Sequence, residues 1–557
     1  MTPRGSGGGR RVAVVTGGAA GIGAAIAEEL GRRGYCVVTL DPVVALDGSP
    51  IDAAGETTAA RIVAAGGDAR ASNTSVTDDD AVGALFADLA GEFGAIDAVV
   101  NVAGISRPTG FATGTEDDWA RVLDVHLNGY LTVLRNALAH MAAAGRGRIV
   151  GVTSGSGWRA GDAGAYSCAK RAVASLTWQL GTAAPPGVTV NALSPIAATR
   201  MVAGALARAA AAGNTSRSGR TAGSGGVALA AAPPPEHLGP IGAFLAGDDL
   251  PWCRGQVIFS AGSEASVVAP PRLLEMLRTT DAVSVAHALD TAVPATFVPA
   301  EAQQSSTGGS VPRFTGAFDA AATAPRRDGH CVVVADDPAR ARVLTDALAA
   351  RGATCTTVTA PAGGGFADAA DALARAAGAG PLDAVVVALD GTAASAVEIT
   401  WERILAEHAD ITDRIRTDAA WVRAAADHAA RAEWPVRIVT VTDATTAGGR
   451  SRAMAAAQLA RAARGATGER VLAFAIAVET AAARGWAGAA ALAAHTAFAD
   501  GVEGLSGAEL VAADDWVGLR SHPQVAGTVS YGGPEVPGWL GAALRRLVPG
   551  AGTGDGG

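Results

Sequence analysis

The stretch Thr16-Gly17-Gly18-Ala19-Ala20-Gly21-Ile22-Gly23 stands between a strand-like run and a helix-like run. The strand-like run is Arg11–Thr16 (RVAVVT), and the helix-like run is Ala24–Arg33. Glycines at such a junction let the backbone approach a pyrophosphate, and the first turn of the helix offers free N–H groups and positive potential. A glycine-rich turn on its own is weak evidence for a nucleotide site, so the sequence around it carries the argument.

Strand-like and helix-like runs alternate through the first half of the chain. Continuous apolar strands that are separated by helices indicate a parallel sheet with both faces covered. We therefore predict an α/β fold of the doubly wound, Rossmann-like type. The further strand-like runs are Tyr35–Leu40, Ile96–Val100, Arg148–Thr153, Val188–Ala192 and Gln256–Phe259.

The second half of the chain repeats this outline. A new series of strand-like and helix-like runs begins with His330–Ala335 and Ala339–Arg351. An internal repeat predicts two tandem Rossmann-like domains rather than three different ones. The matching stretches are Ile96–Val100 with Leu382–Val386, Trp119–Leu123 with Trp401–Leu405, Arg148–Thr153 with Arg437–Thr442 and, loosely, Gly255–Gly262 with Gly527–Gly533.

Composition shifts suggest where the domains end. We predict a catalytic domain over residues 1–285, a polar, Pro- and Gly-rich linker over 286–328, a second domain over 329–549 and a disordered tail over 550–557. Residues 203–235 break the alternation of strands and helices. This segment is either a disordered surface insert or a mobile flap over a substrate pocket.

Composition and charge exclude several classes of protein. The 557 residues include 44 basic and 53 acidic side chains, and the net charge of −9 argues against a nucleic-acid binder, which needs a basic face. We expect neither a membrane span nor a signal peptide, because no long apolar run is present. The five cysteines show no CxxC spacing, so we expect a reduced, cytoplasmic protein without a metal site. They are Cys36, Cys168, Cys253, Cys331 and Cys355.

Asp41 ends the second strand-like run, about 20 residues beyond the glycine stretch. A carboxylate at this place accepts hydrogen bonds from the adenosine ribose of NAD and repels the 2′-phosphate of NADP. The glycine stretch itself contains no arginine. We therefore expect NAD(H) in preference to NADP(H). The alternative is that Asp41 is only a turn former before Pro42.

Ser154, Tyr166 and Lys170 follow the strand-like run Arg148–Thr153. Lys170 is the only lysine of the chain, and Tyr166 is one of 4 tyrosines. Residues four apart on a helix share a face, so we expect the phenol and the ammonium to be neighbours. An ammonium lowers the pKa of a nearby phenol from its usual value of about 10. Tyr166 could then exchange a proton with a substrate oxygen that the Ser154 hydroxyl binds.

With these motifs in this order, residues 11–270 resemble the short-chain dehydrogenase/reductase (SDR) family. Residues 16–23 match its cofactor loop, Asn101-Val102-Ala103-Gly104 its N-x-A-G motif, and the segment Asn191–Pro195 with Thr199 its stretch near the nicotinamide. The resemblance implies hydride transfer between nicotinamide and a carbinol carbon. It makes Tyr166 the acid/base, Ser154 the anchor of the substrate oxygen, and Lys170 the partner of the nicotinamide ribose.

The resemblance also implies the cofactor contacts, and the chain departs from the family pattern at four places. His126 replaces an asparagine that supports a proton relay, and it either joins that relay or only packs there. Ser75 replaces an aspartate against adenine, Ile196 replaces a glycine, and the spacing from Ser154 to Tyr166 is one residue short. The implied cofactor contacts are Thr16, Gly17, Gly21, Ile22, Gly23, Asp41, Ser75, Val76, Asn101, Ala103, Gly104, Tyr166, Lys170, Pro195 and Thr199.

The second half lacks the residues that carry this chemistry. Asp336-Asp337-Pro338 stands in place of the glycine loop, and Asp443 stands in place of Ser154. We predict a degenerate domain that binds no nucleotide and pairs with the first half as an internal pseudo-dimer, with further homo-oligomerisation open. The alternative is that the halves do not touch and the second one recruits another protein.

Together these observations predict an NAD(H)-dependent oxidoreductase (a ketoreductase or alcohol dehydrogenase) in which only the first half is catalytic. Its substrate is a small-molecule ketone or secondary alcohol, and the unusual fusion favours a specialised biosynthetic pathway. Two alternatives stay open: an NAD-binding scaffold with vestigial catalysis, and a non-redox dehydratase or epimerase of the same fold.

Overall fold

The structure is a computed structural model that describes most of the chain. Much of the predicted flap at 203–235, most of the predicted linker at 286–328 and the predicted tail at 550–557 lie outside the described residues, so these interpretations stay predictions. The described residues are 10–51, 55–159, 161–204, 221–222, 228–229, 232–278, 285–297, 328–360, 364–378, 380–389, 399–468, 470–533 and 535–548.

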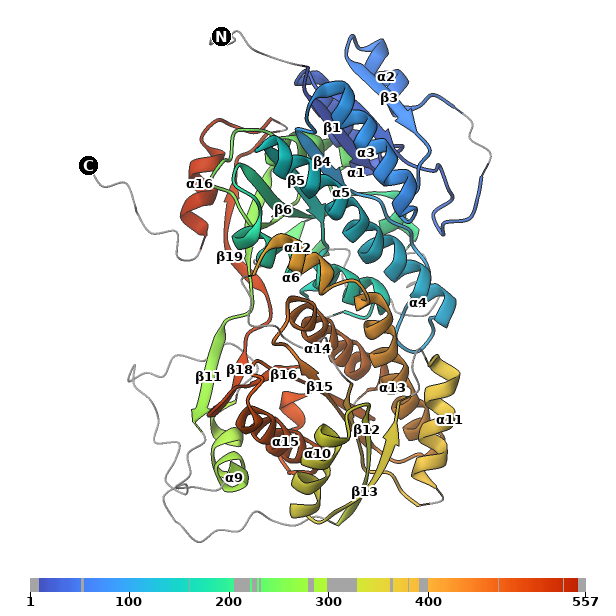
Figure 1. Cartoon of the computed structure of the whole chain (residues 1–557), viewed down its shortest axis with the longest axis vertical. Helices are drawn as coiled ribbons and strands as arrows, with labels where there is room; N and C mark the ends of the chain where they lie inside the picture. The colour runs from blue at the N-terminus through green and yellow to red at the C-terminus, as the bar shows by residue number, and fades with distance from the viewer. Residues whose placement is uncertain are drawn as a thin grey trace, which may run out of the picture.

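A nine-stranded sheet organises the first half (Figure 1). Its strands are parallel from β3 to β9, while β9 pairs with β10 and β10 with β19 in antiparallel fashion. This is the predicted doubly wound α/β arrangement. The strand order is β3 (Asp68–Ser72), β2 (Cys36–Leu40), β1 (Val12–Thr16), β4 (Ala98–Asn101), β5 (Gly147–Val152), β6 (Val188–Pro195), β9 (Val257–Ser260), β10 (Glu264–Ala269) and β19 (Gln524–Ser530).

An eight-stranded sheet organises the second half and repeats this order with one strand fewer at the β13 end. The tandem Rossmann-like fold predicted from the repeats is therefore confirmed. Its order is β13 (Ala353–Thr359), β12 (Gly329–Ala335), β14 (Ala384–Ala388), β15 (Val436–Asp443), β16 (Val471–Val478), β17 (Glu509–Ala512), β18 (Trp516–Arg520) and β11 (Leu273–Arg278). A separate short pair consists of β7 (Thr221–Ala222) and β8 (Ala228–Leu229).

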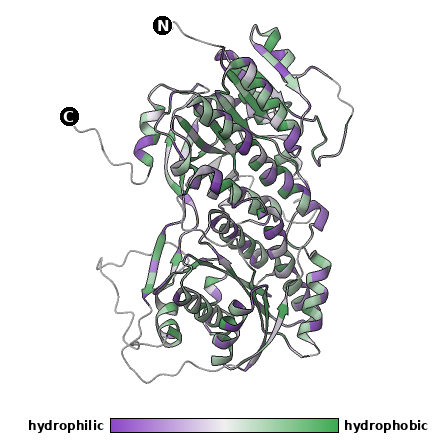
Figure 2. Cartoon of the chain, viewed as in Figure 1, coloured by the Kyte–Doolittle hydropathy of each residue, from purple (hydrophilic) through white to green (hydrophobic). Residues whose placement is uncertain are grey.

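Helices cover both sheets, and Figure 2 shows hydrophobic residues along the central strands and hydrophilic residues spread over the helices. No helix within the described residues has the length and apolar character that a bilayer crossing requires. In the first half the helices are α1 (Gly21–Arg32), α2 (Thr58–Ala64), α3 (Asp79–Phe93), α4 (Glu116–Leu123), η1 (Asp124–Asn128), α5 (Gly129–Ala144), η2 (Gly155–Gly157), α6 (Ala165–Ala183), η4 (Pro235–Leu238) and α8 (Gly239–Leu245). The later helices are α9 (Val285–Thr296), α10 (Pro338–Ala350), α11 (Phe366–Ala377), α12 (Trp401–Ala406), α13 (Ile411–Ala432), α14 (Ala447–Thr467), α15 (Ala483–Phe498), η5 (Glu503–Leu505) and α16 (Leu540–Leu547).

The two halves exchange strands. The strand β11, which precedes the predicted linker, pairs with β18 in the second sheet, whereas β19 crosses back and pairs with β10 in the first sheet. Figure 1 shows green β11 beside red β18, and red α16 beside the first sheet. The sheet orders make β17 the counterpart of β9, so the loose match between Gly255–Gly262 and Gly527–Gly533 paired the wrong strands. The predicted boundaries at 285 and 329 stay a prediction, but the sheets do not separate there.

A layer of helices forms the seam between the halves. Helices α4, α5 and α6 pack against α12, α13 and α14, with α6 against α14 at its centre (Figure 1). One continuous apolar core crosses this seam and includes Ala172 on α6 and Leu459 on α14. The buried Arg171 of α6 also forms an ion pair with Glu509 of β17. The two halves are therefore in extensive contact.

Candidate active site

The glycine stretch forms a cradle at the carboxyl end of β1. Gly17 has φ +64° and Gly21 has φ +59°, a region that favours glycine. A Cβ on Gly17 would lie 2.8 Å from the backbone nitrogen of Ala103, and one on Gly23 would lie 2.2 Å from the Gly17 carbonyl oxygen. No side chain caps the N-terminus of α1, and its first turn holds no acidic residue. These free N–H groups fit a pyrophosphate.

Hydrogen bonds tie this cradle to the neighbouring strands. Thr16 Oγ1 donates to Asn101 Oδ1 at 2.8 Å and accepts from the Ala103 backbone nitrogen at 3.1 Å. The methyl group of Thr199, which follows Pro195 and β6, lies 3.9 Å from the place a Gly21 Cβ would take. Ile22 instead packs against the apolar core under α1. The predicted residues of β1, β4 and β6 therefore meet at one edge of the sheet.

Asp41 lies where the sequence places it, at the end of β2 and beside the glycine stretch. Its carboxylate accepts a hydrogen bond from the Ala19 backbone nitrogen at 3.1 Å and from the Val43 nitrogen at 2.8 Å. Val43 itself has φ +53°, so the chain turns sharply after Asp41. Asp41 is therefore a turn residue and also a carboxylate beside the glycine cradle.

A cavity that encloses about 810 Å³, including the solvent at its mouth, is lined by some of the predicted cofactor contacts. The predicted residues that line it are Gly17, Asp41, Ser75, Val76, Ala103 and Gly104. The sequence analysis missed the remaining lining residues, although the segment of His126 pointed to the part of the chain that supplies Asp124 and Val125. These are Leu40, Pro42, Val44, Asp47, Gly48, Thr77, Ile105, Arg121, Asp124 and Val125.

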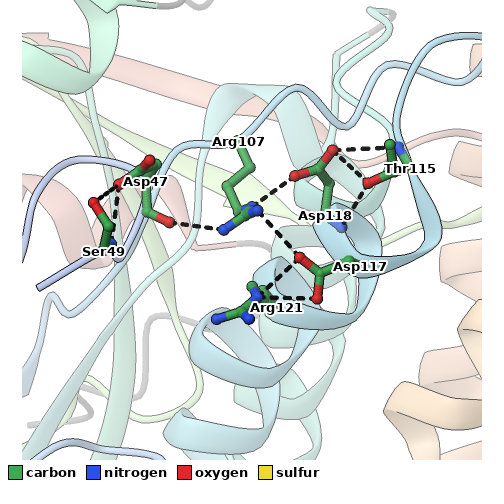
Figure 3. Close-up of polar contacts among 7 residues, drawn as sticks. All are labelled: Asp47, Ser49, Arg107, Thr115, Asp117, Asp118 and Arg121. Carbon is green, nitrogen blue, oxygen red and sulfur yellow. Dashed lines mark hydrogen bonds and ion pairs between the residues drawn. The ribbon is translucent and has the colours of Figure 1, made fainter.

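The rim of this cavity is fixed by a charged network (Figure 3). Arg107 lies in the middle of it: Nη1 donates to the Asp47 carbonyl oxygen at 3.2 Å, while Nε and Nη2 reach Asp118 at 2.6 Å and Asp117 at 3.1 Å. Arg121 is held by Asp117 on the same helix. The network fastens the loop after β2 to α4, and it binds both arginines to carboxylates.

Ser154, Tyr166 and Lys170 meet at the end of β5. Lys170 is 4% exposed, and its Nζ lies 5.7 Å from the centre of the Tyr166 ring. It donates a hydrogen bond to the Val152 carbonyl oxygen at 2.7 Å. The Ser154 hydroxyl acts on the Tyr166 phenol and lowers its pKa, so the two groups face each other. The hydroxyl oxygen of Ser154 accepts a hydrogen bond from the Ser156 nitrogen at 3.2 Å. The one-residue shorter spacing therefore still brings the two hydroxyl groups together.

The electrostatics of this group differ from the expectation in one respect. Burial raises the pKa of Tyr166, and the neighbouring Ser154 hydroxyl opposes this only in part. Burial also lowers the pKa of Lys170 to about 7. The expected lowering of the Tyr166 pKa by Lys170 is thus wrong for this arrangement, because desolvation of the phenol dominates. The phenol keeps its proton at neutral pH.

His126 lies in a π-helical turn, η1, between α4 and α5. Its ring packs edge-on against Tyr166 with the ring centres 5.0 Å apart, and its Nε2 lies 2.8 Å from the Ile105 carbonyl oxygen. Nδ1 is buried without a hydrogen-bond partner among the described residues. The ring also fills the space where a Gly104 Cβ would be, at 2.4 Å. His126 therefore packs in the site and touches the phenol.

The buried histidines make the stability of the chain sensitive to acid. Burial lowers the pKa of His126 to about 3 and that of His408 to about 4. Between these values and an unfolded pKa of about 6.5, only the unfolded chain binds the protons, so each group removes ~1.4 kcal/mol of stability per pH unit as the pH falls. We expect urea unfolding to show a loss of about 3 kcal/mol from the pair between pH 6.5 and pH 5, because the unfolded histidines are already half protonated at pH 6.5. His126→Asn should halve the loss of unfolding free energy that the two histidines cause. An unchanged dependence of the unfolding free energy on pH in this variant would contradict the low pKa of His126.

The corresponding place in the second half is filled by side chains. Asp337 caps the N-terminus of α10 by accepting from the Ala339 nitrogen at 2.7 Å. Arg340 donates to Asp443 at 3.0 Å, and its guanidinium lies 4.4 Å from the centre of the Trp486 ring. Where the first half has a glycine cradle and Ser154, the second half has a carboxylate and an ion pair. Within the described residues, no cluster of His, Cys, Asp and Glu side chains is placed to hold a metal.

Comparisons with known proteins agree with this geometry. A family model described as short chain dehydrogenase matches residues 11–208. The cis-4-hydroxycyclohexanecarboxylate dehydrogenase of Sinomonas cyclohexanicum is 42% identical over 201 residues, which are 35% of this chain and 76% of that protein. The chain belongs to the short-chain dehydrogenase family. It is also similar to the acetoacetyl-CoA reductase of Cupriavidus necator, with 36% identity over 33% of this chain and 74% of the relative.

As a member of the SDR family, the chain is an NAD(P)-dependent oxidoreductase that acts on CH–OH groups. One solved structure is similar to both halves at once. It is described as the N-domain of a bacterial malonyl-CoA reductase with NADP, and it covers 87% of this chain and 95% of its own chain with a TM-score of 0.63. At 18% identity this is a likeness of fold alone. Two tandem domains of this type therefore also occur together in another protein.

Proposed function

We propose that the first half of this SDR chain interconverts a secondary alcohol and a ketone with NAD(H), and that the second half is a non-catalytic scaffold. The observation that carries the proposal is the meeting of Ser154, Tyr166 and Lys170 at the end of β5. The glycine cradle and the cavity of Asp41 lie at the carboxyl ends of the parallel strands, on the same side of the sheet. Open α/β sheets bind ligands at these strand ends.

The residues of the chain fit a dinucleotide. The uncapped N-terminus of α1 would hold its pyrophosphate, Asp41 the adenosine ribose, and Lys170 the nicotinamide ribose. A bound nicotinamide supplies or accepts a hydride. The Tyr166 phenol, protonated at neutral pH, donates its proton to the ketone oxygen during reduction and takes it back during oxidation. The Ser154 hydroxyl fixes that oxygen beside the phenol.

A panel of ketones and secondary alcohols, assayed with both NAD(H) and NADP(H), tests this proposal. The expected result is turnover that is seen as a change in nicotinamide absorbance. Product formation without that change would point to a non-redox dehydratase or epimerase instead. Cofactor binding without turnover of any tested compound would favour a scaffold with vestigial catalysis.

The preference for NAD(H) rests on the charge of the cavity around Asp41. Three carboxylates line this cavity, those of Asp41, Asp47 and Asp124. The one arginine among its lining residues, Arg121, is bound to Asp117. A 2′-phosphate would thus meet negative charge without a free cation to bind it.

Asp41→Asn is expected to lower the ratio of kcat/KM for NAD(H) over NADP(H) by about tenfold or more, because it removes the repulsion of the 2′-phosphate. Steady-state kinetics with both cofactors measure this ratio. Asp47→Asn is the matched control, because that carboxylate is engaged by Ser49 and should change the ratio less. A wild-type chain that prefers NADP(H) would overturn the proposal.

The second half supports the first half through the seam. Its own would-be nucleotide site is filled by the Arg340–Asp443 pair, while its helices cover α4, α5 and α6. We infer that it takes the place of a partner subunit, so that the chain is an internal pseudo-dimer. Because the two halves are covalently linked, this contact forms at high effective concentration.

The contacts of Gln458 on α14 support a scaffold role for the second half. Gln458 is fully buried, and its Nε2 donates to the carbonyl oxygens of Ser156 at 3.0 Å and Arg159 at 3.1 Å. Both carbonyls belong to the loop that begins at Ser154. Beside it, Arg461 donates to the Trp158 carbonyl oxygen at 3.2 Å. The second half thus fixes the loop that presents the Ser154 hydroxyl.

Gln458→Met is expected to lower kcat by roughly 10- to 100-fold, because loss of the amide lets the Ser154 loop shift. NADH affinity should stay unchanged. Gln179→Met is the matched control, since Gln179 lies in the same seam but its amide nitrogen donates to Ala447 and Ser451 of the second half. Equal effects of the two variants on kcat would show that Gln458 acts only on the stability of the seam.

A further inference from the structure

A second cavity lies on the seam between the halves, away from the candidate active site. Together with the solvent at its open side it encloses about 720 Å³. One wall comes from α6 of the first half, through Ser175, Trp178 and Gln179, and the opposite wall comes from α14 and β16 of the second half. Ser175, the residue of this wall nearest to Tyr166 along α6, is nine residues beyond it, so about 14 Å of helix separates the two positions. The cavity is therefore a separate site.

Most of the cavity wall is apolar. Trp178, Met454 and Leu510 line it together with the pair Pro270–Pro271 and small alanine side chains such as Ala477. It extends into a more open region around Ala444 and Thr445, at the carboxyl end of β15. In open α/β sheets this end of the strands is where ligands bind. The second half thus keeps a ligand-sized space although its nucleotide cradle is filled.

One positive charge faces this space without an ion pair to any described residue. Arg450 lines both the apolar part and the open part of the cavity. Its Nε donates to Gln179 Oε1 at 3.1 Å and its Nη1 to the Thr445 carbonyl oxygen at 3.4 Å, and both partners are neutral. Among the described residues, no carboxylate lies within ion-pair distance of Arg450. Burial lowers the pKa of its guanidinium, and the negative charges of Glu407 and Glu479, which lie beyond ion-pair distance, oppose this only in part.

The other charged groups of the wall are already paired. Glu479 accepts two hydrogen bonds from Arg520, at 2.5 and 2.6 Å. Glu509 is bound by Arg171 and by His522, whose pKa burial lowers to about 2, so that the imidazole is neutral. The charges around the cavity therefore leave one cation in excess, and it is the guanidinium of Arg450.

We propose that this seam cavity binds a small monocarboxylate with an apolar body, whose carboxylate pairs with Arg450 and whose body lies against Trp178 and Met454. A planar guanidinium matches a carboxylate with two parallel hydrogen bonds. Burying the apolar body removes hydrocarbon surface from water. Binding at this cavity does not depend on hydride transfer. Because α6 forms one wall of the cavity, a bound ligand would contact the same helix that carries Tyr166.

Calorimetric titration of the full chain with benzoate, octanoate and naphthalene-2-carboxylate tests the proposal. At least one of them is expected to bind with a 1:1 stoichiometry, and its affinity should fall tenfold or more in Arg450→Gln. The neutral carboxamide of the same body should lose little affinity in that variant. Arg470→Gln, a change of an exposed arginine on the same half, is the matched control.

Two further measurements locate the bound probe. Ala477→Phe, which fills the cavity from the end of β16, should abolish binding of both the acid and the amide. Binding should persist in Tyr166→Phe, which separates this site from the active site. The proposal is overturned if none of the three acids binds, or if binding is indifferent to both Arg450→Gln and Ala477→Phe while circular dichroism shows that both variants are folded.

Discussion

Tyr166→Phe is expected to lower turnover of any accepted alcohol or ketone by roughly 10²- to 10⁴-fold, the usual contribution of a positioned acid or base. The phenol is the acidic group that the Ser154 hydroxyl faces and that lies beside the Lys170 side chain. Phenylalanine keeps the ring, and with it the edge-on contact to His126, so the fold should be unchanged. Steady-state rates from nicotinamide absorbance, together with NADH binding by fluorescence, measure the effect.

The matched control is Tyr35→Phe. Tyr35 is buried next to β2, and its hydroxyl accepts a hydrogen bond from Arg11 at 3.2 Å, far from Ser154 along the sheet. Removal of the Tyr35 hydroxyl should leave turnover within about twofold of the wild-type rate, because only an interaction outside the candidate active site is lost. If both variants retain wild-type rates, Tyr166 is not the acid/base and the proposed mechanism fails. If NADH binding is also lost in Tyr166→Phe, the phenol also binds the cofactor, a role that the proposed mechanism does not include.

The sequence predicted the fold well because the signals for it are local. The continuous apolar runs such as Val12–Thr16 and Val436–Asp443 are strands in the structure. The glycine stretch opens a helix because Gly17 and Gly21 adopt positive φ, and the repeats correctly indicated two sheets. Each of these features depends on neighbouring residues or on a spacing that the chain itself displays.

The exchange of strands was not predictable in the same way. The sequences of β11 and β19 contain no pattern that identifies the strand each one pairs with, because an alternating edge strand can pair with either sheet. Their pairing with β18 and β10 is set by the whole assembly of two halves. Likewise, the helix α9 occupies the start of the predicted linker, where composition alone suggested irregular structure.

The site shows the same division between local and non-local information. The residue types at Ser154, Tyr166 and Lys170 indicated the chemistry, and their i and i+4 spacing indicated a shared face. The direction of the Tyr166 pKa shift depended on burial by distant segments, which spacing does not show. The Arg107 network and the loop of Asp47 were missed because their contacts join residues up to 60 positions apart.

Ending the chain at residue 285 is expected to leave the first half insoluble or inactive, although all its predicted catalytic residues are kept. The first sheet would lose β19, and β10 would become an open edge that favours aggregation. Helix α16 would be lost as well, and with it the buried contacts of Leu540 and Leu544, each worth about 1.5–3 kcal/mol. Buried Arg171 would lose its Glu509 partner, a change that costs about 3–5 kcal/mol.

Together these losses reach the whole stability of a typical domain, which is about 5–15 kcal/mol. Co-expression of residues 1–285 with residues 286–557 is the control, because every strand is then present and only the covalent link is cut. We expect this pair to copurify as a soluble complex that regains turnover, whereas residues 1–285 alone should appear in the insoluble fraction. A soluble, fully active 1–285 fragment would contradict the scaffold role, since the catalytic half would then need neither the exchanged strand nor the helices across the seam.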